Sequence, residues 1–325
     1  MAMNTTTKLV VIGGGTGSFM VLSGLKKYFS NITAVISMAD DGGSSGRLID
    51  EYGVLPPGDI RQCLVALATA PKARELFSYR FDEGSFAGHC FGNIFLTATE
   101  KLTGNFIDGV KLAGKLLRVV GRVEPVTFDK AKLIIKNDGQ IFKGQRVIES
   151  IKVNRPEITF EPLPAPNPAA LQAIKEADLV IIAPGSLYDS LGAVLAVPGV
   201  GAALQKTKAK VVYVCNLVNK PGHTDGFSPV DFANELERLA DTEFLDVVIY
   251  STNQPTPELL KKYATDGELP VEMMATSGHH FQLKGANLLE ENRQFRQSKA
   301  DKIKRALIRH DPDLLAKEIL KVVGK

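Results

Sequence analysis

The chain has 325 residues, of which 44% are hydrophobic and 23% charged, which is typical of a globular protein of one large or two smaller domains. A formal net charge of +3 gives no electrostatic basis for binding nucleic acid, and no apolar run reaches the roughly 20 residues that would insert into a membrane. Cys63, Cys90 and Cys215 lack metal-site spacing, so we expect buried thiols. The N-terminus is too short before its first strand for a signal peptide, so we expect a cytoplasmic protein.

The first 38 residues predict one βαβ unit. A continuous apolar run at 8–12 is typical of a buried parallel strand, and the glycine-rich segment GGGTGS at 13–18 follows it. Apolar residues at helical spacing predict a helix over 19–29, and residues 31–38 predict a second strand. The crossover of such a unit is expected to be right-handed.

Alternation of strand, loop and helix continues along most of the chain. We predict helices at 60–69 and 93–102, and strands at 177–183, 209–218 and 245–251, each followed by a loop and a helix. Near the end, Asp311 as N-cap and Pro312 at the first helical position predict a final helix.

Residues 121–160 break this alternation because their pattern is β-rich. Asn137-Asp138-Gly139 within this block is a hairpin signal. We interpret the block as an insertion on the rim of the main sheet. The predicted fold class is therefore α/β: a single Rossmann-like three-layer domain over 1–325, with a mainly parallel sheet and a small β-rich insertion at 121–160.

The unusual loops all follow predicted strands. They are the glycine-rich loop 13–17, the acidic loop 40–46 and the later loops PGSLYDS (184–190) and NKPGHTDG (219–226). Ligands of open parallel sheets bind outside the carboxyl ends of the strands, so we expect these loops to converge on one site.

The glycine-rich loop fits a phosphate-binding turn, with a structural turn as the alternative. Glycine lets the backbone approach a ligand, and the N–H groups of the following helix favour an anion. Gly13 and Gly15 match the dinucleotide fingerprint, but Ser18 stands at its third glycine. The lysine of a P-loop is also missing, which makes that motif a poor match.

The acidic loop begins with two adjacent carboxylates. Asp40 lies 23 residues after Gly17, close to the spacing of a ribose-binding acid, so NAD is compatible with it. Asp40 and Asp41 need a cation, an arginine or sugar hydroxyls to balance their charges. Backbone N–H groups of 42–45 could form an anion-binding nest. The alternative is a solvated turn.

The remaining loops offer polar groups with two interpretations each. Arg61 either clamps a phosphate or pairs with Asp59 or Asp41. His89 and Asn93 either reach a ligand or cap a turn, and the lack of neighbouring Cys or His partners argues against a metal there.

The 184–190 loop presents hydroxyls and backbone N–H groups to an anion, and its tyrosine either stacks on a base or packs in the core. In the 219–226 loop, Asp225 either binds a ligand hydroxyl or closes a turn.

Taken together, the segments GGGTGS, ADDGGSSGRL, PPGDIR, GHCFGN, PGSLYDS and HTDG, in this order, resemble the YvcK family of bacterial gluconeogenesis factors. That family is related to CofD, the 2-phospho-L-lactate transferase. The resemblance extends from Lys8 to residues 309–311 and implies a Rossmann-like fold and a cytoplasmic bacterial protein.

The resemblance also implies functions. YvcK proteins are associated with growth on gluconeogenic carbon sources, cell shape and peptidoglycan synthesis, and bind UDP-sugars such as UDP-N-acetylglucosamine (UDP-GlcNAc). CofD relatives transfer a phospholactyl group from a guanosine diphospho-carrier to a deazaflavin with Mg²⁺. The candidate partners are cell-wall synthesis proteins and further copies of the same chain in a homo-oligomer, whose size the sequence does not give.

Two further residues enter through the resemblance alone, because Tyr263 and Arg309 match UDP-sugar-binding positions of relatives. No catalytic residue is assigned. The complete set of candidate ligand-binding residues is Gly13, Gly14, Gly15, Thr16, Gly17, Asp40, Asp41, Ser44, Ser45, Arg47, Asp59, Arg61, Asn93, Gly185, Ser186, Tyr188, Asn216, Asp225, Tyr263 and Arg309.

The chain departs from the family pattern in two loops. Asp189 replaces a threonine, which adds negative charge near the expected anion site, and Asn219, Lys220 and His223 replace other residues. Lys220 could offset the charge of Asp189. Pro312 stands where relatives can carry threonine, so phosphorylation cannot be transferred to this position.

Three hypotheses of function follow. The first is a regulatory protein that binds a UDP-sugar or related nucleoside diphosphate. The second is a CofD-like transferase, in which Asp40 or Asp41 would carry Mg²⁺. The third, an NAD(P)-binding protein or oxidoreductase, ranks lowest because no proton donor can be identified for a hydride transfer.

Overall fold

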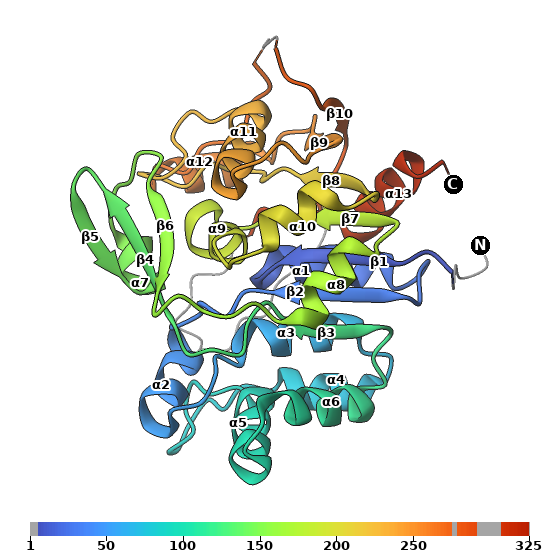
Figure 1. Cartoon of the computed structure of the whole chain (residues 1–325). Helices are drawn as coiled ribbons and strands as arrows, with labels where there is room; N and C mark the ends of the chain where they lie inside the picture. Colours follow the sequence, from blue (N-terminus) through green and yellow to red (C-terminus); the bar gives the residue numbers. More distant parts are fainter. Residues whose placement is uncertain (1–5, 275–277, 291–306, 325) are drawn as a thin grey trace.

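The computed structural model describes residues 6–274, 278–290 and 307–324. Within them, a seven-stranded sheet has the order β10-β9-β8-β7-β1-β2-β3, and all neighbouring strands are parallel. Figure 1 shows helices on both sides of this sheet, which confirms the predicted fold class. The strands are β1 (Leu9–Gly13), β2 (Ile32–Ile36), β3 (Arg122–Pro125), β7 (Leu179–Ile182), β8 (Lys210–Val214), β9 (Val247–Ser251) and β10 (Gln282–Ala286).

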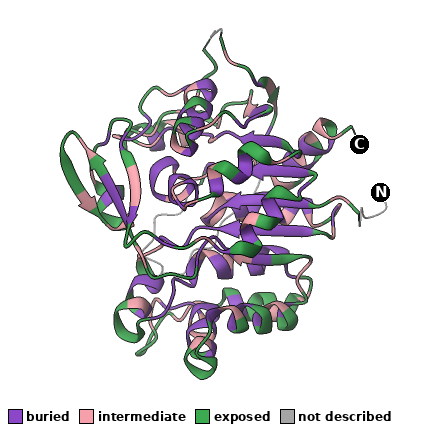
Figure 2. Ribbon diagram, in the orientation of Figure 1, coloured by how far each residue is buried: buried purple, intermediate pink, exposed green. Residues whose placement is uncertain are grey.

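The central strands are buried on both faces, as a parallel sheet between helical layers requires. Every residue of β1, β2 and β7 is buried, and Figure 2 shows this part of the sheet as the interior of the molecule. Because successive side chains point to opposite faces, Val10 and Ile12 join one hydrophobic cluster and Leu9 and Val11 the other. The buried thiols expected of the three cysteines are confirmed.

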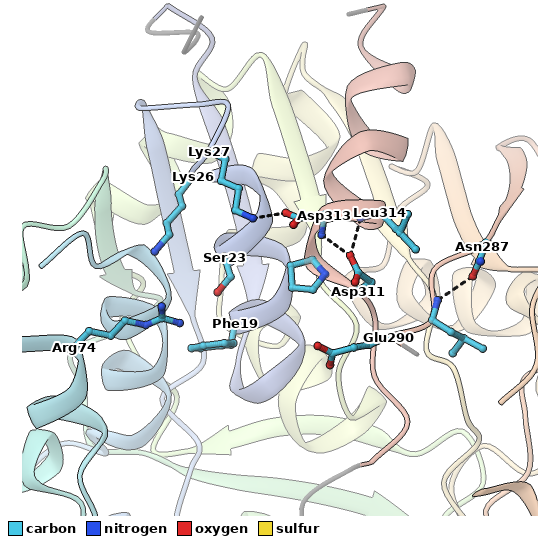
Figure 3. Close-up of a pocket in the computed structure, with 12 residues that line it drawn as sticks. Phe19, Ser23, Lys26, Lys27, Arg74, Asn287, Glu290, Asp311, Asp313 and Leu314 are labelled. Atoms are coloured by element: carbon cyan, nitrogen blue, oxygen red, sulfur yellow. Dashed lines mark hydrogen bonds and ion pairs between the residues drawn. The ribbon is translucent and has the colours of Figure 1, made fainter. Parts of the chain in front are cut away.

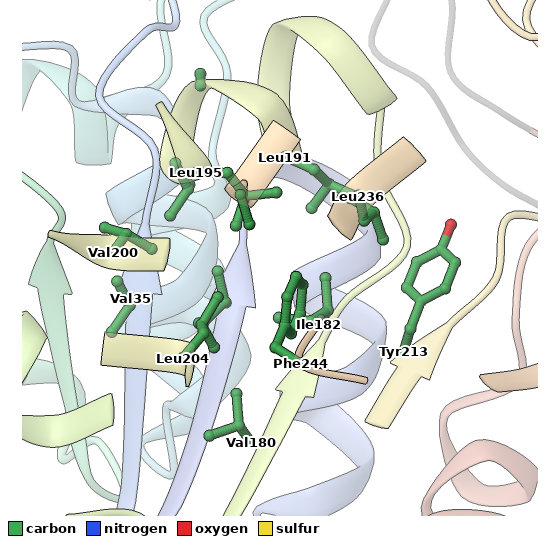
Figure 4. Packing of buried hydrophobic residues seen from close by; sticks show 14 of the residues in the cluster. Val35, Val180, Ile182, Leu191, Leu195, Val200, Leu204, Tyr213, Leu236 and Phe244 are labelled. Carbon is green, nitrogen blue, oxygen red and sulfur yellow. The ribbon is translucent and has the colours of Figure 1, made fainter. Parts of the chain in front are cut away.

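One helical layer packs on the cluster that contains Val10. Figure 4 shows Ile182, Leu195, Leu204 and Leu236 meeting there. The helices of this layer are α8 (Pro168–Lys175), α9 (Gly192–Leu195), α10 (Val200–Lys206) and α11 (Pro229–Ala240), and a π-helical turn (Leu187–Leu191) leads into α9.

The opposite layer packs on the cluster that contains Leu9. It consists of α1 (Gly15–Leu25), α3 (Gly58–Leu67) and α13 (Pro312–Val322), with α4 (Pro71–Ser78), α5 (Phe91–Thr103) and α6 (Phe106–Leu117) against α3. Asp311 caps α13 as predicted, because its carboxylate accepts from the N–H groups of Asp313 and Leu314. Outside these two layers and the insertion, the described residues also form α2 (Gly43–Tyr52) and α12 (Pro257–Ala264).

The β-rich block forms a separate three-stranded antiparallel sheet beside the main one (Figure 1). It contains β4 (Lys132–Asn137), β5 (Gln140–Lys143), β6 (Glu157–Glu161) and the short helix α7 (Gln145–Ser150). The predicted hairpin is confirmed, with Asp138 and Gly139 both at positive φ, as a tight two-residue turn needs. The predicted start at residue 121 is wrong because β3 pairs in parallel with β2 and belongs to the main sheet.

Some elements differ from the prediction. α2 occupies part of the predicted acidic loop, and α1 begins at Gly15, inside the predicted glycine loop. The sequence analysis also did not identify α4, α6, α7, α8, α10 and β10.

Among the described residues, no single helix is long and apolar enough to cross a membrane. One bent pair, residues 187–195 and 200–206 at 72° to each other, has sufficient length and apolar content when taken together.

Candidate functional site

The topology places a ligand crevice between β1 and β7. From β1 the chain adds strands toward β3 on one side, and from β7 it adds strands toward β10 on the other. Sheets of this kind bind ligands at such a switch point, outside the carboxyl ends of the strands. The glycine-rich loop follows β1 and the 184–190 loop follows β7, so two of the predicted loops lie side by side there.

The two loops touch at Gly17. A methyl group on Gly17 would lie 1.7 Å from the carbonyl oxygen of Pro184, so only glycine allows this contact. Gly17 lies in the first turn of α1, whose N-terminal N–H groups lack partners within the helix. The start of α1 therefore faces the switch point with donors that suit an anion, one of which, the Gly15 N–H, already interacts with the Asp59 carboxyl group.

A cavity of about 150 Å³ adjoins this contact. Asn216, two residues after the end of β8, fixes one wall: its amide accepts from the N–H of Gly185 at 3.0 Å and donates to the Gly185 carbonyl at 2.9 Å. Thr16 and Arg309 line the same cavity. Residues that follow β1, β7 and β8 therefore meet an arginine that is distant in sequence.

Tyr263 supports this arrangement from outside the cavity. Its side chain is buried, and its hydroxyl accepts from the N–H groups of Leu307 at 2.6 Å and Ile308 at 3.1 Å. Since Arg309 follows directly, Tyr263 positions the arginine-bearing segment. A ligand contact by Tyr263 itself has no support in this geometry.

Asp40 and Asp59 are the carboxylates that approach each other at the ends of β1 and β2. A methyl group on Gly58 would lie 2.3 Å from Asp40 Oδ2, and one on Gly14 would lie 2.4 Å from Asp59 Oδ2. Asp40 accepts from the Ser45 hydroxyl at 2.6 Å and from the Gly42 N–H at 3.1 Å. The pair thus connects the acidic loop to the glycine-rich loop.

Burial shifts the pKa of both carboxyl groups. Desolvation and then the charge of Asp40 raise the pKa of Asp59 to about 7, although the Gly15 N–H and Arg61 oppose the shift. Desolvation likewise raises the pKa of Asp40, against its hydrogen bonds from Ser45 and Gly42. The site therefore holds a carboxyl group that changes charge near neutral pH.

This shift predicts a specific pH dependence of stability. Because the folded protein keeps a proton on Asp59 that the unfolded chain loses near pH 4, the contribution of Asp59 to stability falls as the pH rises from about 4 to about 7. Asp59→Asn should remove that loss, so its free energy of unfolding should rise relative to that of the wild type between pH 5 and pH 8. Urea unfolding at both pH values measures this, and parallel pH profiles would contradict it.

Asp41 has a structural partner instead. Its two carboxylate oxygens accept from the backbone N–H groups of Gln145 and Arg146, both at 3.0 Å, at the start of α7. The solvated-turn alternative for Asp41 is therefore wrong, and the carboxylate pair of the site is Asp40 with Asp59. Adjacent residues can diverge in space because the chain turns between them.

Asp41→Ala should loosen the β-rich insertion without unfolding the main domain. Loss of a helix cap costs about 1 kcal/mol. Hydrogen exchange of the amides in 145–150 should therefore accelerate about fivefold, whereas the amides of β1 should be unaffected. Unchanged exchange in α7 would show that Asp41 does not hold the insertion.

Arg61 belongs to a buried polar network. Its Nε donates to Asn93 Oδ1 at 2.8 Å, Asn93 Nδ2 donates to the Ser44 hydroxyl at 3.2 Å, and this hydroxyl lies 3.1 Å from His89 Nδ1. Asn93 is the hydrogen-bond partner of Arg61, and neither Asp59 nor Asp41 is. Arg61 still acts on Asp40 and Asp59 through its charge. The network fixes α2, α3 and α5 around the carboxylates.

Asp189 and Lys220 form an ion pair beside the 184–190 loop. Lys220 Nζ lies 3.0 Å from Asp189 Oδ2 and 3.3 Å from the Ser186 hydroxyl, and Asp189 is 0% exposed. Lys220 therefore offsets the charge of Asp189, as the sequence suggested. Asp189 contributes to the raised pKa of Asp59, so the pair is near the carboxylates as well.

Three candidate residues have local roles. Tyr188 is fully buried in the core beside the His223 ring, at 5.9 Å between centroids, so the hypothesis that it stacks on a base is wrong. Asp225 accepts from the Gly222 N–H at 2.6 Å and closes a turn. Arg47 is exposed and donates to the Ala87 carbonyl at 3.1 Å.

Glu149 was missed by the sequence analysis. It lies on α7, and burial followed by the charge of Asp189 raises its pKa, with smaller contributions from Asp40 and Asp41. No motif marks it, because only the docking of the insertion brings it near the site. In the described part of the chain, no three or more acidic, histidine or cysteine side chains are grouped as metal ligands.

The fold and the switch-point crevice define a Rossmann-like α/β protein. Residues 9–292 match the family described as 2-phospho-L-lactate transferase CofD. A UPF0052-family structure from Bacillus halodurans superposes with a TM-score of 0.85 at 31% identity, over 98% of this chain and 99% of that one.

Two curated relatives agree with this assignment. The chain is 41% identical to the "Putative gluconeogenesis factor" of Nostoc sp., over 98% of this chain and 69% of the relative. It is 37% identical to the "Gluconeogenesis factor" of Bacillus subtilis, over 83% of this chain and 86% of the relative. The chain therefore belongs to the CofD/UPF0052 family, in the branch of the YvcK gluconeogenesis factors.

Proposed function

We propose that this protein binds a UDP-sugar, such as UDP-GlcNAc, at the switch point and acts as a cytoplasmic regulator of cell shape and peptidoglycan synthesis during gluconeogenic growth. The observation that carries the proposal is the convergence of the α1 N-terminus, the Gly185–Asn216 wall and Arg309 on one cavity. Helix N-termini and arginine are the groups that bind diphosphates.

The neighbouring side chains suit the rest of such a ligand. Carboxylates hydrogen-bond to ribose and sugar hydroxyls, and Asp40 and Asp59 stand beside the glycine-rich loop. Lys220 adds a second cation next to Ser186. The names of the relatives support a role in gluconeogenic growth.

A CofD-like transferase is the second candidate, favoured by the family match over 9–292 and by the two carboxyl groups of raised pKa. Their oxygen atoms fit Mg²⁺, which is commonly held by one or two carboxylates together with substrate phosphates. Asp40 and Asp59, rather than Asp40 and Asp41, would hold the ion, since Asp41 caps α7. Mg²⁺ would supply charge neutralisation of the diphosphate. NAD(P) remains a lower-ranked ligand.

Calorimetry with UDP-GlcNAc, GDP and NADPH, each with and without Mg²⁺ and followed by product analysis, separates these functions. If the protein is a regulator, it should bind UDP-GlcNAc without Mg²⁺ and without turnover. Arg309→Ala should then lower the affinity for UDP-GlcNAc roughly tenfold or more. Lys111→Ala removes an exposed charge on α6 and serves as the control. Mg²⁺-dependent cleavage of a diphosphate would instead establish the transferase.

A further inference from the structure

A second cavity, of about 630 Å³, lies between α1, α4 and the start of α13 (Figure 3). As far as the structure describes the chain, it shares no lining residue with the switch-point cavity. The residues that matter for the argument are Phe19, Ser23, Lys26, Arg74, Glu290 and Asp311. None of them belongs to the candidate site above.

One wall of this cavity carries two cations, Lys26 and Arg74, with no anion between them among the described residues, and Lys26 Nζ also donates to the Ala68 carbonyl at 2.7 Å. Burial, and then the charges of Arg74 and Lys27, lower the pKa of Lys26 to about 8. The guanidinium of Arg74 makes no hydrogen bond or ion pair with the described residues, and it lies 5.8 Å from the centroid of the Phe19 ring. Each of these positive charges disfavours the other, so an anion between them would stabilise both.

The other charged residues near this wall are already committed. Lys27 pairs with Asp313. Asp311 accepts from the N–H groups of Asp313 at 2.8 Å and Leu314 at 2.9 Å, and so caps α13. Neither aspartate is therefore available to balance Lys26 and Arg74.

Ser23 adds a hydroxyl to the cationic wall. It lines the cavity between Lys26 and Phe19, and its Oγ is buried without a hydrogen-bond partner among the described residues. An unpaired buried hydroxyl costs free energy, and rotation about its Cα–Cβ bond would let it donate to a ligand oxygen.

The opposite wall has different chemistry. Figure 3 shows Glu290 across the cavity from Arg74, with the ring of Phe19 between them. A carboxylate accepts hydrogen bonds from hydroxyl groups, and an aromatic ring offers an apolar floor. The cavity can hold more than a bare anion, and its two walls suit opposite ends of one molecule.

We propose that this cavity binds a phosphate monoester of a polyhydroxylated metabolite, that is, a sugar phosphate. The phosphate contacts Lys26, Arg74 and Ser23, and the hydroxyl groups face Glu290. Two cations and a hydroxyl donor match a dianion with three acceptor oxygens better than a single carboxylate.

Calorimetric titration of the full chain with glucose 6-phosphate, glucose and inorganic phosphate tests this proposal. Glucose 6-phosphate should bind, inorganic phosphate should bind more weakly, and glucose should not bind. Arg74→Ala should lower the affinity for glucose 6-phosphate about tenfold, and Ser23→Ala about threefold. Ser23→Ala should fold normally, because alanine is the better helix former.

The control variant is Lys72→Ala, which removes a positive charge from the same helix, α4, at an exposed position paired with Glu75. It should leave the affinity unchanged. Failure of glucose 6-phosphate to bind would overturn the proposal. Loss of binding in Arg309→Ala but not in Arg74→Ala would also overturn it, because the ester would then occupy the switch point.

The pH dependence gives an independent readout. Lys26 faces Lys27 beside it in the turn that follows α1 and Arg74 on α4, with Asp311 and Asp313 of the α13 start and Glu290 on the other walls. As the pH rises above about 8, Lys26 loses its proton and the affinity for glucose 6-phosphate should fall several-fold, since glucose 6-phosphate stays dianionic. Equal affinities at pH 7 and pH 9.5 would contradict a contact with Lys26.

Discussion

Gly17→Ala is expected to abolish ligand binding at the switch point and to lower the free energy of unfolding by about 3 kcal/mol or more. The added methyl group would lie 1.7 Å from the Pro184 carbonyl oxygen and 2.7 Å from its carbon. Both atoms are backbone, so the loops after β1 and β7 would have to separate. Urea unfolding and calorimetry with UDP-GlcNAc measure the two effects.

The matched control is Gly185→Ala in the same cavity. There the added methyl group would meet its nearest atoms, in Leu191, at 3.5 Å, an ordinary contact. Its free energy of unfolding should stay within about 1 kcal/mol of the wild type. Equal stability of the two variants would show that the loops separate without cost.

Lys220→Met is expected to lower the free energy of unfolding by about 2 to 3 kcal/mol. It leaves Asp189, which is 0% exposed, as a buried charge without its cation, and this is the costly way to break an ion pair. Lys208→Met, at an exposed position before β8, removes the same charge and should be neutral. Chemical denaturation of both variants measures the difference.

The double variant Lys220→Met, Asp189→Asn should recover most of the lost stability. Asparagine keeps the shape of the side chain but removes the charge that needs compensation. If the double variant is as unstable as Lys220→Met alone, the loss arises from packing of the lysine stem and not from the ion pair.

The sequence was sufficient to predict an element of secondary structure wherever the local residue pattern agrees with the burial of that element in the fold. The strands β1, β2, β7, β8 and β9 are apolar runs between loops, and a sheet covered on both faces produces that pattern. The start of α13 was predictable because its cap is a local interaction between Asp311 and the next two amides. The hairpin at Asn137–Gly139 is local for the same reason.

Prediction failed where tertiary contacts override local preference. The segment that forms α2 begins GSSG, which is a poor helix former. Its Ser44 and Ser45 are buried against His89, Asn93 and Asp40, and these contacts hold the helix in place. β3 was assigned to the insertion because a sequence does not show which strand it will pair with.

By itself, the sequence determined the layered α/β fold, the family and the loops that form the site, because these depend on hydrophobic periodicity and on motifs within short segments. Only the tertiary structure decided the partner of each polar group. In the folded protein Asp40 interacts with Asp59, Asp41 caps α7, Tyr188 is buried and Lys220 pairs with Asp189. These choices depend on desolvation and distance between segments far apart in the chain, which no local pattern encodes.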